Sequence, residues 1–320
     1  MFRQLYILIL TVLLLPVGLS GQGVSDSMQI TLGYPVYSQY LQNGLMINPA
    51  YAGSREALSV ALSYRMQWMG TKGAPLLQSV SLHTPMKNDK VALGFKARFM
   101  QYGVTRSTSL FGVYAYQIRL AAGKLSFGLK AGVNMSNNDY SGLLGITRPD
   151  PVFAEDEKSY LLPNAGFGVY YFTDRFFGGL SIPSFLCYKN AGNGNAQIYH
   201  DFKEYEFIIN AGGLINISPL FRIKPSVLVN FSLQDTKRLN QFDLNGNLII
   251  ADIIWVGASY RTTEQVVVGL LQFQITQQLM AGLSYDYPAG RMNTYSKGSS
   301  EFMIRYEFGS KVSAANPRYF

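Results

Sequence analysis

The sequence predicts an all-β protein, a 14-stranded antiparallel transmembrane β-barrel of the outer-membrane type. Three observations predict it. In many segments every second side chain is uncharged, as on one face of a β-strand. The connections between these segments alternate between short and long, and the composition is poor in charged residues. Charged residues make up 14% of the 320 residues, against about 25% in ordinary soluble domains. Beyond residue 23 no apolar run approaches the ~18 residues that a membrane-spanning helix needs.

Residues 1–23 have the pattern of a signal peptide, which predicts export from the cytoplasm. Arg3 supplies the positive start, residues 5–15 form an apolar core, and small residues follow up to residue 21. We expect cleavage between Ser20 and Gly23. Cys187 is the only cysteine, which excludes an intramolecular disulfide and a multi-cysteine metal site.

Residues 24–55 form an irregular N-terminal lead-in ahead of the first strand. Turn-forming pairs such as Asn48-Pro49 and Gly53-Ser54 interrupt the segment, and only Leu45-Met46-Ile47 between them is apolar. The segment is richer in aromatic residues than a disordered leader, and a barrel of this size encloses space that must be filled. We therefore expect it to plug the lumen or to contact a periplasmic partner; the alternative is a loose periplasmic leader.

Residues 56–309 contain the barrel, and residues 310–320 form a C-terminal periplasmic tail. The hairpin over 107–133 shows the alternation most plainly, because its Tyr, Phe and Leu residues share one parity while Arg119 and Lys130 lie on the other. Fourteen strands are predicted, over 57–69, 76–84, 91–101, 107–120, 124–134, 162–172, 175–187, 204–215, 220–232, 241–250, 253–261, 264–275, 278–287 and 300–309.

The length of each connection depends on whether the strand before it is odd- or even-numbered. All connections after even-numbered strands are short, whereas the long ones, such as 136–161 and 188–203, follow odd-numbered strands. Outer-membrane barrels have short periplasmic turns and long outer loops. The pattern therefore predicts an integral outer-membrane protein with both termini in the periplasm.

The register of single strands supports a lipid-facing outer surface. In the third strand Leu93, Phe95 and Phe99 share a parity, opposite Lys96 and Arg98. A Lys or Arg on the lipid face near mid-bilayer would cost about 2–4 kcal/mol. The charged parity is therefore expected to face a polar lumen. The strand over 264–275 is too apolar to orient in this way.

Several short strings of residues resemble the PorP/SprF family. They are Tyr37-Ser38-Gln39-Tyr40, Ile47-Asn48-Pro49-Ala50-Tyr51-Ala52-Gly53-Ser54, Tyr64-Arg65-x-Gln67-Trp68, Gly73-Ala74-Pro75, His83-Thr84-Pro85 and the ending Asn316-Pro317-Arg318-Tyr319-Phe320. Many members have Cys where Asn316 stands. The resemblance implies an outer-membrane barrel of Bacteroidetes that serves type IX secretion, gliding motility or the surface attachment of adhesins. It also implies a periplasmic, peptidoglycan-associated OmpA-like partner.

Two sets of partner contacts are expected from this resemblance. The loops 136–161 and 188–203 would meet a secreted adhesin or its C-terminal domain outside the membrane. The lead-in and the tail would meet the periplasmic partner, through Tyr37, Tyr40, Asn48, Pro49, Tyr51, Arg318, Tyr319 and Phe320.

Charged residues of the lumenal parity have two possible roles. They could give the pore a preference for anions, or they could pair with acids such as Glu204, Glu206, Glu301 and Glu307 and brace the interior. We favour bracing, because enclosed charges need partners. The predicted lumen-facing charges are Arg65, Lys96, Arg98, Arg119, Lys130, Arg222, Lys224, Glu301 and Arg305.

The residues present offer little for catalysis or for metal and nucleic-acid binding. There are two histidines, His83 and His200, and no nucleophile, base and orienting group can be named together. Loop acids at 150 and 155–157 are better explained as solvated groups than as a Ca²⁺ site, and the basic residues are scattered. We predict a non-enzymatic barrel without cofactors, metals or nucleic-acid partners, which works through lipid and protein contacts. The alternative is a passive pore or transporter for a small apolar or anionic solute.

Overall fold

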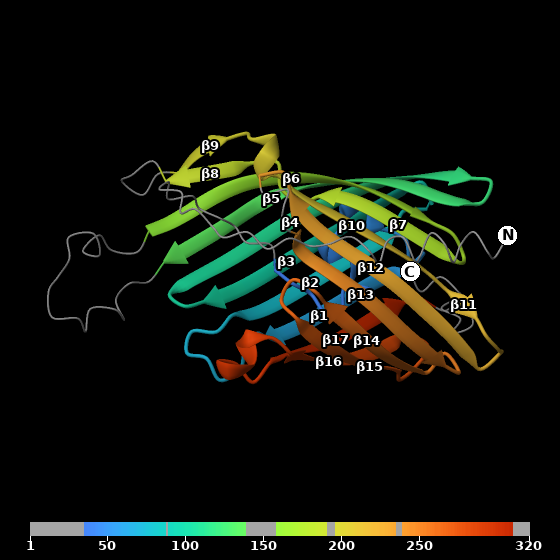
Figure 1. Cartoon of the computed structure of the whole chain (residues 1–320). Coiled ribbons are helices and arrows are strands. Elements are labelled where there is room, and N and C mark those ends of the chain that lie inside the picture. Colours follow the sequence, from blue (N-terminus) through green and yellow to red (C-terminus); the bar gives the residue numbers. More distant parts are fainter. Residues whose placement is uncertain (1–34, 88, 139–157, 191–195, 235–238, 310–320) are drawn as a thin grey trace, which may run out of the picture.

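The chain forms one closed antiparallel sheet whose strands tilt around a common axis (Figure 1). The computed structural model describes residues 35–87, 89–138, 158–190, 196–234 and 239–309. The strands of the sheet are β1 (Leu58–Met66), β2 (Leu76–Pro85), β3 (Val91–Tyr102), β4 (Thr105–Leu120), β5 (Gly123–Asn138), β6 (Lys158–Phe172), β7 (Phe176–Ile182), β10 (Glu206–Gly213), β11 (Ile215–Asn216), β12 (Phe221–Ser232), β13 (Leu239–Ile250), β14 (Ile254–Arg261), β15 (Val266–Gln274), β16 (Leu279–Pro288) and β17 (Ser299–Phe308).

The closed sheet has fourteen strand positions, which confirms the predicted fold class. β10 and β11 both pair with β12 in one continuous register, so they are two parts of a single barrel strand. Pairing of β1 with β17 and of β10 with β12 completes the circle. No open sheet edge therefore remains among these strands, as a barrel in lipid requires.

The predicted strand over 175–187 is too long, and the predicted loop over 188–203 is not structureless. The strand β7 ends at Ile182, directly before Pro183, whose missing N–H cannot join a sheet ladder. Beyond it, β8 (Cys187–Asn190) and β9 (Ala196–Tyr199) form a separate hairpin, followed by the 3-10 helix η4 (Phe202–Glu204). The hairpin lies at the left end of the barrel in Figure 1.

The two ends of the barrel differ in their connections. The short-turn end carries the tight connections, such as those from β4 to β5 and from β13 to β14, and lies at the right in Figure 1. The long-loop end carries the β8–β9 hairpin and η5 (Arg291–Thr294). The predicted signal peptide, most of the loop 136–161 and the tail 310–320 fall outside the described residues. None of the described helices is long and apolar enough to cross a membrane.

Side chains of alternate parity lie in opposite environments. Tyr114 is 46% exposed and Leu129 is 55% exposed on the outer surface, whereas their neighbours Val113 and Lys130 are buried in the interior. An exposed belt of hydrocarbon side chains is costly in water and favourable in lipid. The outer surface therefore suits a membrane, as the register predicted.

A cysteine placed on this surface should be protected by lipid. We expect Leu129→Cys, made in a Cys187→Ser background, to resist a membrane-impermeant maleimide in intact outer membranes, because its thiol would face acyl chains. Tyr295→Cys is the matched control, since Tyr295 is 74% exposed between β16 and β17. Equal labelling of the two cysteines would contradict a lipid-facing β5.

Candidate functional site

Residues 35–55, here called the plug, lie inside the barrel and fill its lumen. The plug contains two short 3-10 helices, η1 (Gly44–Met46) and η2 (Pro49–Tyr51), and appears in blue within the barrel in Figure 1. Leu45 and Ala50 are completely buried, and both pack in a cluster with side chains of the wall. The described lumen is therefore occupied by the chain itself.

The plug runs from the long-loop end toward the short-turn end. Ser38 contacts Asp286 and Glu301, which lie near the long-loop ends of β16 and β17. The Gly53 N–H donates to Nδ1 of His83, near the short-turn end of β2, at 3.1 Å. The chain then turns directly into β1. The prediction that the N-terminus is periplasmic concerns residues outside the described part of the chain.

Glycines in the wall let the backbone and the Asn48 side chain of the plug approach closely. A Cβ atom on Gly128 would lie 2.2 Å from the Ala50 nitrogen, and one on Gly168 would lie 2.1 Å from the Asn48 Oδ1 atom. Asn48 caps η2 by accepting from the Ala50 N–H at 2.9 Å, while its Nδ2 donates to the Val169 carbonyl at 3.0 Å. The fit therefore depends on the absence of side chains at these two wall positions.

A buried ion network holds the plug on the long-loop side. It consists of Arg65, Arg261, Asp243, Asp286 and Glu301, all at most 3% exposed. Arg65 contacts Asp286 at 2.6 Å and Glu301 at 3.3 Å, and Arg261 contacts Asp243 at 3.1 Å and Asp286 at 3.2 Å. The Ser38 hydroxyl donates to Asp286 at 2.8 Å and accepts from Arg65 at 2.9 Å. The network thus joins five wall strands, β1, β13, β14, β16 and β17, to the plug.

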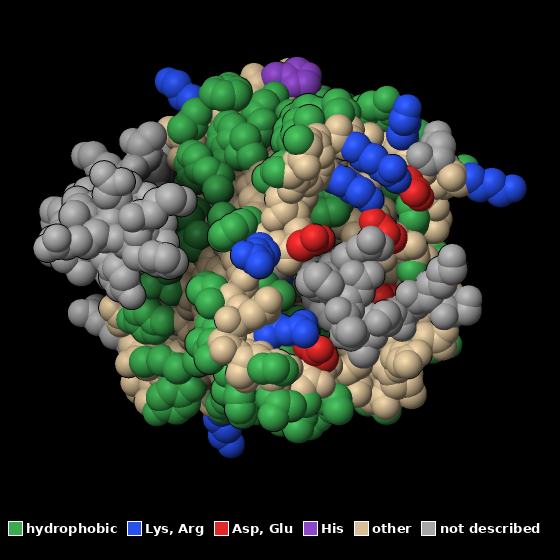
Figure 2. Space-filling model, turned by 90° about the vertical axis from the view of Figure 1, so that its right-hand side faces the viewer, with side chains coloured by type: hydrophobic (Ala, Val, Ile, Leu, Met, Phe, Trp, Pro, Cys, Tyr) green, Lys and Arg blue, Asp and Glu red, His purple; other side chains and the backbone are tan. Residues whose placement is uncertain are grey.

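A second set of charges lies toward the short-turn end. Glu307 contacts Arg55 of the plug at 3.3 Å and Arg305 of its own strand at 3.1 Å. Arg305 also donates to the side-chain oxygen of Gln42 at 2.6 Å. Figure 2, which views this end, shows basic and acidic side chains together near its centre. Both ends of the plug are therefore held by charged groups.

The predicted lumen-facing charges fall into distinct environments. Arg65, Glu301 and Arg305 belong to the ion-paired groups above. Lys224 lies between the rings of Phe177 and Trp255, with its Nζ atom 5.6 and 5.4 Å from their centroids. Two other predicted residues are not buried in the lumen. Arg222 is half-buried beside Asp252 at the short-turn end. The Arg119 side chain is 68% exposed at the rim.

Several partners of these charges were not predicted from the sequence. Asp243, Asp286, Arg261 and Arg55 complete the ion pairs, whereas Glu204 lies outside the barrel and accepts a hydrogen bond from Tyr199. The lumenal position of Arg261 could have been predicted, because it shares a parity with the other lumenal residues of its strand. Its carboxylate partners could not, because they depend on which strands face one another across the lumen.

The predicted partner-binding residues of the lead-in are buried. Tyr37, Tyr40, Asn48, Pro49 and Tyr51 all lie within the plug and pack against the wall. A direct contact of these side chains with a periplasmic protein remains a prediction, and it would require the plug to leave the lumen. The other three predicted contact residues, Arg318, Tyr319 and Phe320, lie outside the described residues.

The described residues offer no obvious metal centre. Within that part of the chain, no three or more His, Cys, Asp or Glu side chains are grouped as metal ligands. His83 is buried and accepts from the plug backbone, and it packs edge-on against Tyr51 at 5.5 Å. Its role in the structure is to hold the plug.

Comparison with known proteins gives the family of the chain and relatives of its barrel fold. Residues 30–306 match the family model of the type IX secretion system membrane protein PorP/SprF. No curated protein matches the sequence significantly. Among solved structures, the CymD monoaromatic hydrocarbon channel is similar with a TM-score of 0.50 and 12% identity, over 89% of this chain and 95% of that one. Omp33 of Acinetobacter baumannii is similar with a TM-score of 0.47 and 9% identity, over 79% and 99%.

Proposed function

Because this chain belongs to the PorP/SprF family of type IX secretion membrane proteins, we propose that it serves this pathway as a non-enzymatic outer-membrane barrel that binds protein partners. The observation that carries the proposal is the filled lumen. Plug residues such as Leu45 and Ala50 are completely buried, and charged groups hold both ends of the plug. A barrel closed by its own chain acts through its surfaces.

The surface at the long-loop end supports binding of a secreted adhesin or its C-terminal domain. Phe202 is 59% exposed there, and its ring packs edge-on against Tyr205 at 5.7 Å and Phe207 at 5.5 Å. Exposed aromatic clusters are typical of protein interfaces. The β8–β9 hairpin beside them adds Ile198, which is 48% exposed. This surface, formed by the hairpin and residues 202–207, is the proposed adhesin site.

The short-turn end is proposed to face the periplasm and to meet a peptidoglycan-associated OmpA-like protein. Partly exposed ion pairs line this end, including Lys124 with Glu56 at 2.6 Å and Arg222 with Asp252 at 3.0 Å. Charged rims favour specific and reversible association more than they add affinity. The proposed contact is therefore polar and separate from the aromatic surface at the other end.

Surface display of the adhesin tests the proposed site. We expect Phe202→Ser combined with Ile198→Ser to release the adhesin into the medium, because the pair removes the two exposed large apolar side chains of this surface. The barrel itself should remain in the membrane and still co-purify with the periplasmic partner. Tyr295→Ser, in another exposed loop at the same end, is the control. Normal display by the double variant would contradict the proposed adhesin site.

Conductance separates this proposal from the alternative of a passive pore for a small apolar or anionic solute. The purified barrel in a planar bilayer is expected to be nearly silent, because the plug fills the lumen. A steady ohmic current through the unmodified protein would favour the pore.

A further inference from the structure

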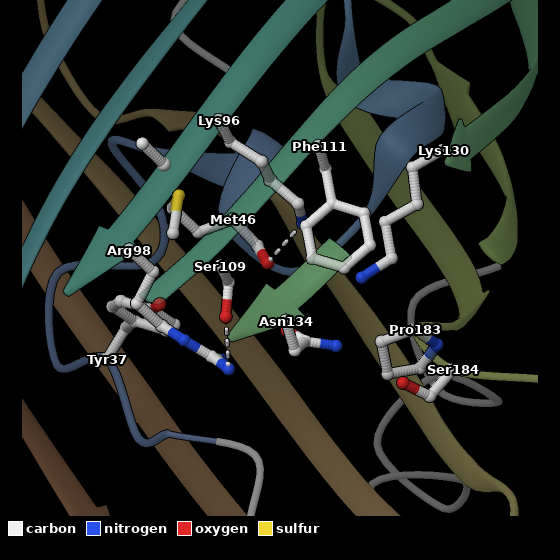
Figure 3. Close-up of a pocket in the computed structure, with 11 residues that line it drawn as sticks. Tyr37, Met46, Lys96, Arg98, Ser109, Phe111, Lys130, Asn134, Pro183 and Ser184 are labelled. Carbon is white, nitrogen blue, oxygen red and sulfur yellow. Dashed lines mark hydrogen bonds between the residues drawn. The ribbon is translucent and has the colours of Figure 1, made fainter. Parts of the chain in front are cut away.

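A small cavity with an unusually basic wall lies between the plug and strands β3 to β5. Lys96, Arg98 and Lys130 line it, and no Asp or Glu among the described residues does so. Figure 3 shows these three side chains around the cavity, with Tyr37 and Met46 of the plug close to Arg98 and Lys96. The cavity, here called the basic pocket, has a volume of about 40 Å³, room for a few water molecules or one small anion.

The three cations of the basic pocket retain unused hydrogen-bond donors. Lys96 donates to the carbonyls of Leu45 and Met46 at 3.2 and 3.1 Å, which leaves one of its three N–H groups. Arg98 donates from Nη2 to the Ser109 hydroxyl at 3.0 Å, but its buried Nε has no acceptor. Lys130 places its Nζ 4.2 Å from the centroid of the Phe111 ring and makes no hydrogen bond with the described residues.

One neighbouring polar side chain of the basic pocket, that of Asn134, also lacks a partner among the described residues. Asn134 is 3% exposed and lines the pocket, yet its side chain makes no hydrogen bond within the described part of the chain. Tyr37 also lines the pocket, and its phenol interacts with the Arg98 guanidinium. Glu206 attracts Lys130 electrostatically but does not line the pocket. Burying positive charge is costly, and a bound anion would offset that cost.

The basic pocket differs from the ion network in how its cations are paired. In the ion network every guanidinium contacts a carboxylate of the wall. In the basic pocket, Lys96, Arg98 and Lys130 form no ion pair with the described residues. We propose that the basic pocket binds a small oxyanion, a carboxylate or phosphate group, which accepts hydrogen bonds from Arg98, Lys130 and Asn134. The proposal does not depend on the role in secretion.

Titration calorimetry of the full chain in zwitterionic nanodiscs at low salt tests the proposal. Acetate or phosphate is expected to bind saturably with one site per chain, whereas the neutral analogue acetamide should not bind. Arg98→Gln combined with Lys130→Gln should weaken binding tenfold or more, because both charge-assisted donors are lost. Arg119→Gln, at the exposed rim, should leave the affinity unchanged.

A second variant and a comparison of two peptides complete the test of anion binding. If the double variant does not insert, Asn134→Leu removes a donor without changing the charge and should weaken binding several-fold. A peptide with a free C-terminal carboxylate, compared with its amidated form, distinguishes a group carried by a polypeptide from a free small anion. Equal heats for acetate and acetamide, or unchanged affinity in a folded double variant, would overturn the proposal.

Discussion

Replacing Gly128 with leucine is expected to displace the plug and to make a closed barrel conduct ions. The Cβ of the new side chain would lie 2.2 Å from the Ala50 nitrogen and 2.3 Å from the Pro49 carbonyl carbon. Both atoms belong to the backbone, so no flexible side chain can move aside. Forcing extra methylenes into packed space typically costs about 1–3 kcal/mol. Here that cost falls on contacts between the plug and the wall.

The wall itself is expected to tolerate the substitution. Gly128 lies within β5, which pairs with β4 over residues 123–138 and with β6 over residues 124–138. The closed sheet carries most of the hydrogen bonds, whereas the plug is held by local contacts. The strain should therefore be relieved by movement of η2 rather than by opening of the barrel.

Single-channel recording in planar bilayers measures this effect. We expect the Gly128→Leu protein to conduct at least ten times more than the nearly silent parent protein. Gly112→Leu is the matched control, since a Cβ on Gly112 would meet only the Ala131 carbonyl oxygen at 3.9 Å. A correctly folded Gly128→Leu protein that stayed silent would mean that the plug accommodates the side chain without leaving the lumen.

The barrel could be predicted from the sequence because its main signal is local. Side chains of a strand alternate strictly, so single residues such as Leu129 and Lys130 already report the two faces of the wall. The structure gives them 55% and 6% exposure. Alternation is lost where the chain leaves the sheet. The premature end of β7 and the hairpin beyond it were missed for that reason.

The interior could be predicted only in part. Burial of the lead-in was one of two expectations, because aromatic content indicates packing but not a location. The pairing of Asp286 with both Arg65 and Arg261 was not predictable, because three strands bring these residues together. Their meeting depends on the closure and stagger of the barrel, which no local pattern encodes. The same holds for the basic pocket.

Removing the Arg261 guanidinium is expected to cause the largest loss of stability of any single charge change in the ion network. Among the described residues, Arg261 is the only cation paired with Asp243, and both side chains are 1% exposed. Arg261→Met would keep the volume but leave Asp243 as a buried charge without a cation. Breaking a buried pair in this way typically costs about 3–5 kcal/mol. Asp286 would also lose one of its two arginines.

Equilibrium unfolding in urea, followed by the heat-modifiable migration of the barrel in gels, measures this loss. Adding Asp243→Asn to Arg261→Met should restore a large part of the stability, because an amide is far cheaper to bury than a carboxylate. Arg119→Met, which breaks an exposed pair with Asp89 at 3.2 Å, should cost no more than about 1 kcal/mol. If Arg261→Met were as stable as Arg119→Met, the ion network would not hold the plug. Since Ser38 binds the same carboxylate of Asp286, the loss should also raise the basal conductance.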